Sequence, residues 1–257
     1  MTAIVLDCET TGLIPHEDRI IELAIVDYET GDLIFHSFFN PGRALPEFIV
    51  NLTKITDEML MYAPPFDREI GEAIAAVISN SEAIIGQNPL FDKMMLAAEF
   101  QRCGVSVKWP PTICTKRIWN KYEPPEERHL INAYKRFVDR IGFEGAHGAV
   151  ADTKAAREVF LAQVVLFDLG NLGWEEFFPE EKKWWGGTSH IIWGENGGLV
   201  CNFGKHKGIP CFEIEAGYWR WIKNESFPAH VVMLANYMVN ISPTTQEELI
   251  TWAKENQ

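Results

Sequence analysis

Long apolar runs are missing from the sequence, and no stretch approaches the roughly 18–20 residues that a membrane-spanning helix needs. The first residues, MTAIVLDCET, have no basic region and no cleavage pattern, so we expect no export signal. Cysteine is scarce, and the five cysteines are scattered and odd in number, which argues against a disulfide framework. We therefore expect a cytoplasmic protein with reduced thiols and no membrane partner.

Basic residues are also few: 23 Lys and Arg stand against 36 Asp and Glu, which gives a formal net charge of -13. Phosphate affinity normally comes from Lys and Arg, so this balance is unusual for a protein that binds nucleic acid. A nucleic-acid enzyme of this composition needs bound metal cations and local basic patches, because salt screens charges beyond about 8 Å. The length of 257 residues suits one large domain, or one domain with a small appendage.

The first 170 residues alternate between apolar segments and segments with helical spacing. Strands are expected at 4–6, 19–29, 33–40 and 82–88, and helices at 66–79, 90–104, 129–142 and 150–167. Gly104 and Gly142 are the expected stops of two of these helices. The first three strands predict a meander, because the turn signal ETGD separates the second from the third. The pattern predicts an α/β domain with mixed strand directions.

A change in composition follows this domain. Residues 170–189 are Gly-rich, charged and aromatic without a clear period, which is typical of a linker. Beyond them, two short strands are expected around the turn ENGG, and helical segments at YWRWIKN and AHVVMLANYMV. We expect three parts: a domain at 1–169, a linker at 170–189 and a small α+β module at 190–257.

Four acids lie at the ends of the expected elements. Asp7 and Glu9 follow the first strand, and their i, i+2 spacing places them on one face, roughly 7 Å apart. Asp92 and Asp152 each lie where a helix begins, and alone either is most simply a helix cap. If all four converge, they make a highly negative pocket that only divalent cations could neutralise, and carboxylate oxygens suit Mg²⁺ or Mn²⁺.

His147 lies five residues before Asp152. On a helix that spacing is about 140° around the axis, so the two can share a site only if His147 precedes the helix. Gly145 and Gly148 favour a loop there. A loop histidine is a suitable general base for activating water, although a lone loop histidine is more often without a role.

The C-terminal module carries a compact cation cluster, Lys205, His206 and Lys207, between two glycines. Aromatic faces are expected nearby, from Tyr218, Trp219 and Trp221. Cations beside aromatic rings can hold phosphates and stack the bases of a single strand. The alternative is that the tryptophans form the core of a small domain.

A zinc site is a further alternative for this module. Its ligands would be Cys201, His206 and Cys211. The spacing and the missing fourth ligand argue against it.

Three segments of the sequence resemble the motifs of the DEDD exonucleases in order and approximate spacing. They are LDCETTGL, NPLFD and HGAVADTKAA. The His-x4-Asp pattern of the third resembles the DEDDh, or DnaQ-like, branch, and LTKITDEML and HLINAYKRF resemble further segments of that branch. The resemblance covers residues 3–165 and departs at Gln87, where many members carry His. The C-terminal module resembles the short domain at the end of exodeoxyribonuclease X-like proteins.

The resemblance implies a ribonuclease H-like fold, a mixed sheet flanked by helices, and a two-metal 3′→5′ exonuclease. It implies that Asp7 bridges two Mg²⁺ or Mn²⁺ ions about 4 Å apart. Glu9 and Asp152 complete the first metal, Asp92 holds the second, and His147 takes a proton from the attacking water. It also implies a substrate-binding set under the terminal nucleotide, namely Thr10, Thr11, Leu13 and Asn88.

The main interpretation is a metal-dependent 3′→5′ exonuclease that hydrolyses DNA, at single-stranded 3′ ends, to nucleoside 5′-monophosphates. One alternative keeps the chemistry but trims short RNA. Another alternative is a non-catalytic nucleic-acid-binding module on a nuclease fold. The complete set of five catalytic residues argues against it. No motif in the sequence indicates docking to a polymerase. The sequence does not decide the oligomeric state, and the resemblance allows a homodimer because several relatives are dimers.

Overall fold

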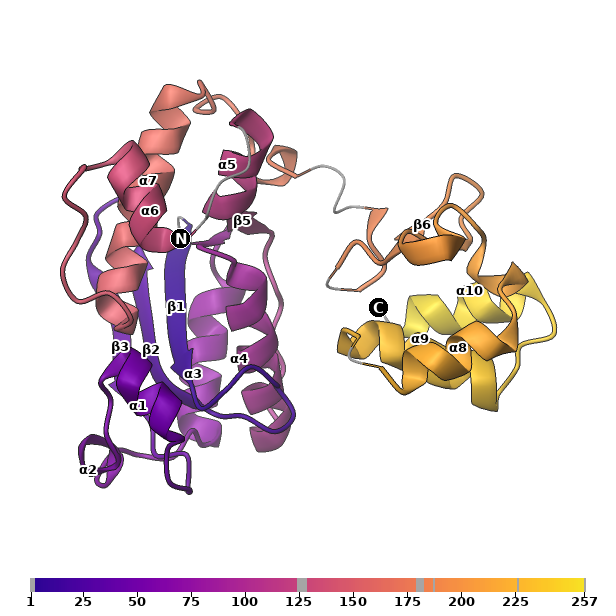
Figure 1. Ribbon diagram of the computed structural model, residues 1–257, viewed down its shortest axis with the longest axis horizontal. Coiled ribbons are helices and arrows are strands. Elements are labelled where there is room, and N and C mark those ends of the chain that lie inside the picture. The colour runs from indigo at the N-terminus through magenta and orange to yellow at the C-terminus, as the bar shows by residue number, and fades with distance from the viewer. Residues whose placement is uncertain (1–2, 124–128, 179–182, 187, 226, 257) are drawn as a thin grey trace. The chain divides into compact units, whose positions relative to one another are not determined.

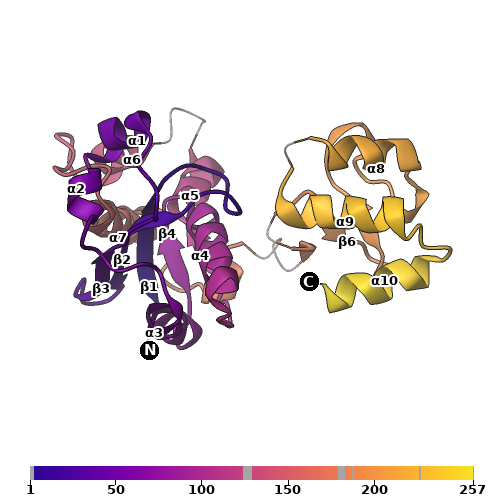
Figure 2. The same cartoon turned by 90° about the horizontal axis from the view of Figure 1, so that it is seen from below.

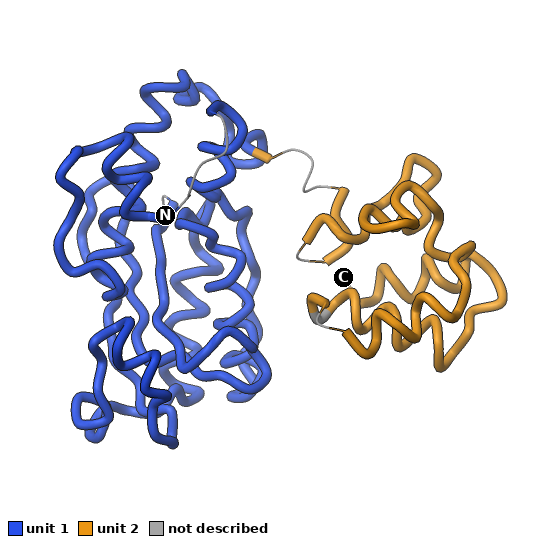
Figure 3. The backbone as a smooth tube through the Cα atoms, viewed as in Figure 1, with its two compact units in different colours: residues 1–177 blue, residues 178–257 orange. Residues whose placement is uncertain are grey.

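The computed structural model describes residues 3–123, 129–178, 183–186, 188–225 and 227–256. The chain divides into two compact units, residues 1–177 and 178–257, shown in different colours in Figure 3. The boundary between the units falls inside the segment 170–189 that the sequence marks as a linker. In the described part of the chain, no helix is both long enough and apolar enough to span a membrane.

Unit 1 is built on a five-stranded sheet in the order β3-β2-β1-β4-β5 (Figure 1). The strands are β1 (Ile4–Thr10), β2 (Ile20–Asp27), β3 (Leu33–Phe38), β4 (Ile84–Gly86) and β5 (Thr112–Cys114). The first three strands form an antiparallel meander, while β4 runs parallel to β1 and β5 parallel to β4. The expected meander and the expected mixture of strand directions are therefore confirmed.

Helices cover both faces of this sheet (Figure 2). They are α1 (Glu47–Thr53), α2 (Asp57–Leu60), α3 (Arg68–Ser79), α4 (Pro89–Cys103), α5 (Thr115–Tyr122), α6 (Leu130–Phe137) and α7 (Ala149–Leu166). Ile4 and Leu6 of β1 pack in one core cluster with side chains of α3 and α4. Because side chains alternate along a strand, Asp7 and Glu9 point to the opposite face, where α7 crosses β1 and β2.

Most of the expected helices are present, but α6 is shorter than the sequence suggests. It ends at Phe137, and Gly142 lies in the following turn with a positive φ of 98°. The N–H groups of Val138 and Asp139 both donate to the carbonyl of Tyr134, and the Asp139 carboxylate accepts from the N–H of Ile141. This local hydrogen bond competes with the helical one and ends the helix. The expected stop at Gly104 of α4 is confirmed.

Unit 2 is a small α+β module with its own core. It contains β6 (Ile191–Trp193), β7 (Leu199–Cys201), α8 (Ala216–Lys223), α9 (Ala229–Asn240) and α10 (Gln246–Glu255), with short 3-10 turns at Gly204–His206 and Cys211–Glu213. The two strands pair antiparallel around the expected ENGG turn. Trp185 and Trp219 are fully buried among the three helices and this hairpin. The module therefore buries an apolar core of its own.

Candidate metal centre and active site

Three carboxylates converge at the end of β1. One oxygen from each of Asp7, Glu9 and Asp152 lies within 4.8 Å of the others. Asp7 and Glu9 come from the face of β1 that meets α7, and Asp152 lies in the first turn of that helix. The register between β1 and β2 shifts directly after Glu9, which ends the regular pairing at the site. The structure thus brings together three of the four predicted acids.

Burial and mutual repulsion raise the pKa of every acid in this cluster. The pKa of Asp7 lies well above its ordinary value because the group is buried and because Asp92 and Asp152 lie nearby. Burial, followed by the charges of Asp152 and Glu22, raises the pKa of Glu9 to about 7. Burial also raises the pKa of Asp152 to about 6. Such shifts are typical of a site that is completed by a cation.

Asp92 lies near Asp7 but is not part of this group of three acids. Its side chain is buried, with 4% of its surface exposed, and its Oδ1 accepts a hydrogen bond of 2.9 Å from the backbone N–H of Cys8. Burial raises the pKa of Asp92 to about 6, although the bonds from Cys8 oppose this shift. Asp92 is thus a neighbour of Asp7 but stands outside the group of three oxygens that converge within 4.8 Å.

The donor set fits a hard divalent cation. It consists of carboxylate oxygens alone, which Mg²⁺ and Mn²⁺ prefer. The Oδ1 atom of Asp152 is buried and has no hydrogen-bond partner among the described residues. Burying a carboxylate oxygen without a partner costs free energy of folding unless a cation binds to it. Asp7, Glu9 and Asp152 therefore form a candidate metal centre.

His147 lies in the turn that leads into α7, as the glycines around it predict. Its backbone is left-handed, with φ at 66°, and the residue is exposed. Its N–H donates to Oδ2 of Asp152 at 3.2 Å, which ties the turn to the acid. His147 also lowers the pKa of Asp152, so its ring lies within electrostatic range of the cluster. The exposed ring remains accessible to water and to a substrate.

A fifth acid near the cluster, Glu22, and its partner His36 were not predicted from the sequence. Glu22 lies on β2 directly opposite Glu9, and only 5% of its surface is exposed. Its Oε1 lies 2.8 Å from Nε2 of His36, and its Oε2 accepts from the N–H of Ala149 at 3.1 Å. A glutamate inside the apolar run RIIELAI was the available signal, because a buried acid needs partners.

The end of β1 and the loop that follows it carry three of the four residues predicted to bind the terminal nucleotide. The Thr10 hydroxyl donates to the carbonyl of Gly12, and the buried Thr11 hydroxyl donates to the Asp18 carboxylate. Asp18 also accepts from Arg43 at 2.7 Å, which fixes the loop. Leu13, by contrast, is 78% exposed. The two threonines therefore shape the loop, and Leu13 is the apolar side chain that it presents.

Asn88, the fourth of these residues, lies between β4 and α4. It is the N-cap of α4, and its backbone is left-handed with φ at 72°. The residue is exposed and its side chain makes no capping hydrogen bond. Its amide can therefore reach a ligand, four residues before Asp92.

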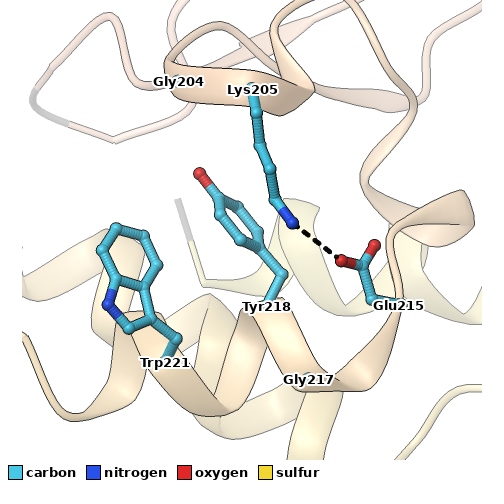
Figure 4. Close-up of a pocket in the computed structure, with 6 residues that line it drawn as sticks. All are labelled: Gly204, Lys205, Glu215, Gly217, Tyr218 and Trp221. Atoms are coloured by element: carbon cyan, nitrogen blue, oxygen red, sulfur yellow. Dashed lines mark hydrogen bonds and ion pairs between the residues drawn. The ribbon is translucent and has the colours of Figure 1, made fainter.

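Lys205 of the predicted cation cluster lines an open groove of about 390 Å³ in unit 2, together with Glu215, Tyr218 and Trp221 (Figure 4). Lys205 lies over the ring of Tyr218 and pairs with Glu215 at 3.2 Å. Trp221 is 46% exposed, and its ring lies 5.3 Å from that of Tyr218. These side chains give the groove an aromatic wall with a cation beside it.

Two expectations for this module need correction. Trp219 offers no face to a ligand, because it is fully buried in the core of unit 2. The side chain of His206 is only 13% exposed, since it packs edge-on against Tyr218 and lies 3.4 Å from Glu215. Lys207, in contrast, is exposed.

The zinc alternative gains no support from the structure. Among the described residues, one group of potential metal ligands converges closely enough to hold an ion, and it is the acidic group of β1 and α7. It does not include Cys201, His206 or Cys211. Both cysteines are buried in the core of unit 2.

Comparisons with known proteins agree with this geometry. A family model described as Exonuclease (RNase_T) matches residues 4–160. DNA polymerase III PolC-type from Staphylococcus aureus, including strains MW2 and USA300, is 32% identical over 167 residues. The match covers 63% of this chain and 11% of that protein, so this chain spans about a tenth of the length of these relatives.

Among solved structures, a chain of Exonuclease X in complex with 5′ overhanging duplex DNA is similar, with a TM-score of 0.51 and 19% identity. The match covers 68% of this chain and 96% of that one. At this identity the likeness shows the fold alone, and it confirms the expected ribonuclease H-like arrangement. The family model spans more than half of the sequence, and the chain belongs to the DnaQ-like exonuclease (RNase_T) family.

Proposed function

We propose that this chain is a DEDDh-type 3′→5′ exonuclease that depends on divalent metal ions and hydrolyses DNA to nucleoside 5′-monophosphates. One observation carries the proposal: carboxylates from β1 and α7 meet within 4.8 Å, with raised pKa values and a buried oxygen that lacks a partner. A cluster of this kind is stable in its charged form only around a cation. Membership in the exonuclease family gives that cation a role in cleaving phosphodiesters.

Asp7, Glu9 and Asp152 would hold the first ion, and Asp7 with Asp92 would hold the second. When bound, Mg²⁺ or Mn²⁺ supplies Lewis-acid stabilisation of the charge that develops on the phosphate during an in-line displacement. The chain's own contribution is to hold the four acids together, Asp92 buried and the other three partly buried. The N–H of Cys8 and the N–H of His147 each orient one of these carboxylates.

His147 is the proposed general base. Its exposed position in the turn before α7 lets an imidazole nitrogen accept a proton from the attacking water. The left-handed backbone at His147, fixed by its bond to Asp152, directs the residue to the same edge of the sheet as the acids.

The terminal nucleotide would lie against the loop after β1. Leu13 would pack against its base, because this large apolar side chain is exposed beside the acids. Thr10 and Thr11 would act through the backbone that their hydroxyls help to fix, and Asn88 would approach the same pocket from the start of α4. Water attack at the terminal phosphodiester would then release one 5′-monophosphate at a time.

DNA is the favoured substrate class. The similar Exonuclease X was solved with duplex DNA that has a 5′ overhang, and the similar PolC-type protein is a DNA polymerase by name. A pocket built for a terminal nucleotide favours single-stranded 3′ ends. Short RNA is the alternative substrate, which a comparison of matched oligonucleotides would decide.

The groove of unit 2 would hold a second stretch of the same strand. Trp221 can stack on a base, and Lys205 and Lys207 can contact phosphates, with His206 supporting Tyr218 from behind. The pair between Lys205 and Glu215 is more than half exposed, so it is weak and a phosphate can compete with the carboxylate.

The test is degradation of a 3′-labelled oligonucleotide in Mg²⁺, with matched DNA and RNA and with single-stranded and duplex forms. The proposal predicts release of labelled 5′-monophosphate, lost on addition of a chelator and in Asp7→Ala and His147→Ala. Inactivity of the wild-type protein on every substrate would overturn the proposal and favour a non-catalytic binding module. Full activity of Asp7→Ala would also overturn it.

A further inference from the structure

Glu22 links the two elements that carry the acidic centre. It lies on β2 opposite Glu9, so the two side chains emerge on the same face of the sheet. Its Oε2 accepts a hydrogen bond of 3.1 Å from the N–H of Ala149, the first residue of α7. Asp152 lies three residues further along the same helical turn. One carboxylate thus joins the strand that faces Glu9 to the turn that carries Asp152.

The first turn of α7 needs this external partner. The first N–H groups of a helix have no partner within the helix, and a capping side chain usually satisfies one of them. The N-cap of α7 is Gly148, which has no side chain to do so. Glu22 supplies the missing acceptor from a neighbouring strand. Its negative charge also complements the positive end of the dipole of this 18-residue helix.

His36 completes the arrangement from β3. Its Nε2 lies 2.8 Å from Oε1 of Glu22, within reach to donate to this carboxylate oxygen, so each oxygen of Glu22 has a hydrogen-bond partner. Glu22 is therefore oriented by two contacts rather than free to act as a ligand. Residues that support metal ligands without contacting the ion commonly fix the geometry of those ligands.

We propose that Glu22, held by His36, is a positioning residue that sets the distance between Asp152 on α7 and the acids of β1. The inference rests on the proposed metal centre. A carboxylate suits this place because one oxygen accepts from the Ala149 N–H while the other faces the His36 ring. The isosteric amide of glutamine has one acceptor oxygen, and its NH₂ group would face one of these two groups.

The experiment measures Mn²⁺ binding directly by electron paramagnetic resonance of the free ion, using the full chain without substrate. We expect Glu22→Gln to weaken Mn²⁺ binding about 10–100-fold, the range found when such second partners are lost. His36→Gln can still donate a hydrogen bond, so we expect a smaller loss, below about tenfold. His36 is 29% exposed, so His36→Ala provides a test if Glu22→Gln does not fold.

Arg157 provides a matched control on the same helix. It lies two turns further along α7 and donates to the carbonyls of Tyr28 and Glu29, so it also ties α7 to the β2–β3 hairpin, but away from the acids. We expect Arg157→Gln to lower the unfolding temperature while its Mn²⁺ affinity equals that of the wild type.

Two results would overturn the inference while leaving the metal centre intact. One is wild-type Mn²⁺ affinity in both Glu22→Gln and His36→Ala. The other is an equal loss of affinity in Glu22→Gln and Arg157→Gln, which would make Glu22 a general structural contact. Absence of Mn²⁺ binding by the wild-type chain is a different result, because it would overturn the proposed function and this inference together.

Discussion

The backbone N–H of Cys8 donates to Oδ1 of Asp92 at 2.9 Å, across 84 residues of sequence. Cys8 lies between the two acids of β1, so this bond fastens the first turn of α4 to the strand that carries Asp7 and Glu9. The same carboxylate that would hold an ion therefore also serves the fold. The two roles can be separated by the choice of substitution.

Asp92→Asn should abolish catalysis with little loss of stability. The amide oxygen of asparagine can still accept from Cys8, but the charge that favours a cation is gone. We expect the rate on a 3′-labelled strand to fall by about 100-fold or more, with a change in unfolding free energy below about 1 kcal/mol. Asp92→Ala leaves a buried N–H without a partner and should cost about 1–3 kcal/mol. A rate near that of the wild type in Asp92→Asn would contradict this assignment.

Asp152→Asn should stabilise the protein when metal is absent. The substitution removes one charge from a group of acids that repel one another, while the amide oxygen can still accept from the N–H of His147. We expect a gain of about 1–2 kcal/mol in a chelator, and a smaller further gain on addition of Mn²⁺ than the wild type shows. Differential scanning calorimetry measures both.

Asp67→Asn is the matched control for that gain. Asp67 caps α3 with a bond to the N–H of Ile70, away from the acids, and asparagine caps equally well. Its unfolding temperature should stay near that of the wild type. A gain in Asp67→Asn equal to that in Asp152→Asn would show that the effect is not specific to the acidic cluster.

The stability of the metal-free protein should fall as the pH rises. The pKa of Glu9 is raised to about 7, and those of Asp92 and Asp152 to about 6, above ordinary values near 4. An acid whose pKa is raised in the folded state stabilises the folded protein at a pH below its unfolded-state pKa. This contribution is lost as the pH rises through the folded-state pKa. We expect urea unfolding in a chelator to show a loss of several kcal/mol between about pH 4 and pH 7.

Bound metal should reverse this trend, because cations compete with protons for the same oxygens. Stabilisation by Mn²⁺ should therefore increase from pH 5 to pH 8. A metal-free stability that rises steadily with pH over this range would contradict the raised pKa values of the cluster.

Trp221→Ala should weaken the binding of single-stranded DNA by the full chain. The substitution removes the exposed ring of the groove, and stacking on an aromatic side chain contributes about 1–3 kcal/mol per base. The affinity should fall by about tenfold or more, and Trp221→Phe should restore most of it. Fluorescence anisotropy with a labelled oligonucleotide in a chelator measures the change, with the exposed Lys254→Ala of α10 as the control. Equal affinities of the wild type and Trp221→Ala would exclude a role for this ring.

Local patterns in the sequence were sufficient to predict much of the candidate site. Alternation along β1 placed Asp7 and Glu9 on one face, and the spacing of His147 from Asp152 required a turn before α7. Both inferences depend only on the geometry of a single element. Glu22 could not be assigned in this way, because its bond to Ala149 joins positions 127 residues apart.

In α8, the helical periodicity distinguishes the buried aromatic residues from the exposed one. Tyr218, Trp219 and Ile222 are the buried residues of this helix and follow an i, i+1, i+4 pattern, which defines one face. Trp221 lies off that face and is exposed. Residue type alone does not distinguish Trp219 from Trp221, whereas their positions on the helix do.

The central claim is that the acids of β1, α4 and α7 bind divalent cations. Isothermal titration of Mn²⁺ into the chelator-treated wild-type chain at pH 8, beside Asp7→Asn, tests it most directly. Since Asp7 is the acid shared by both proposed ions, we predict two bound ions per wild-type chain and loss of binding in the variant. Absence of binding by the wild type, or equal binding by the Asp7→Asn chain, would contradict the claim.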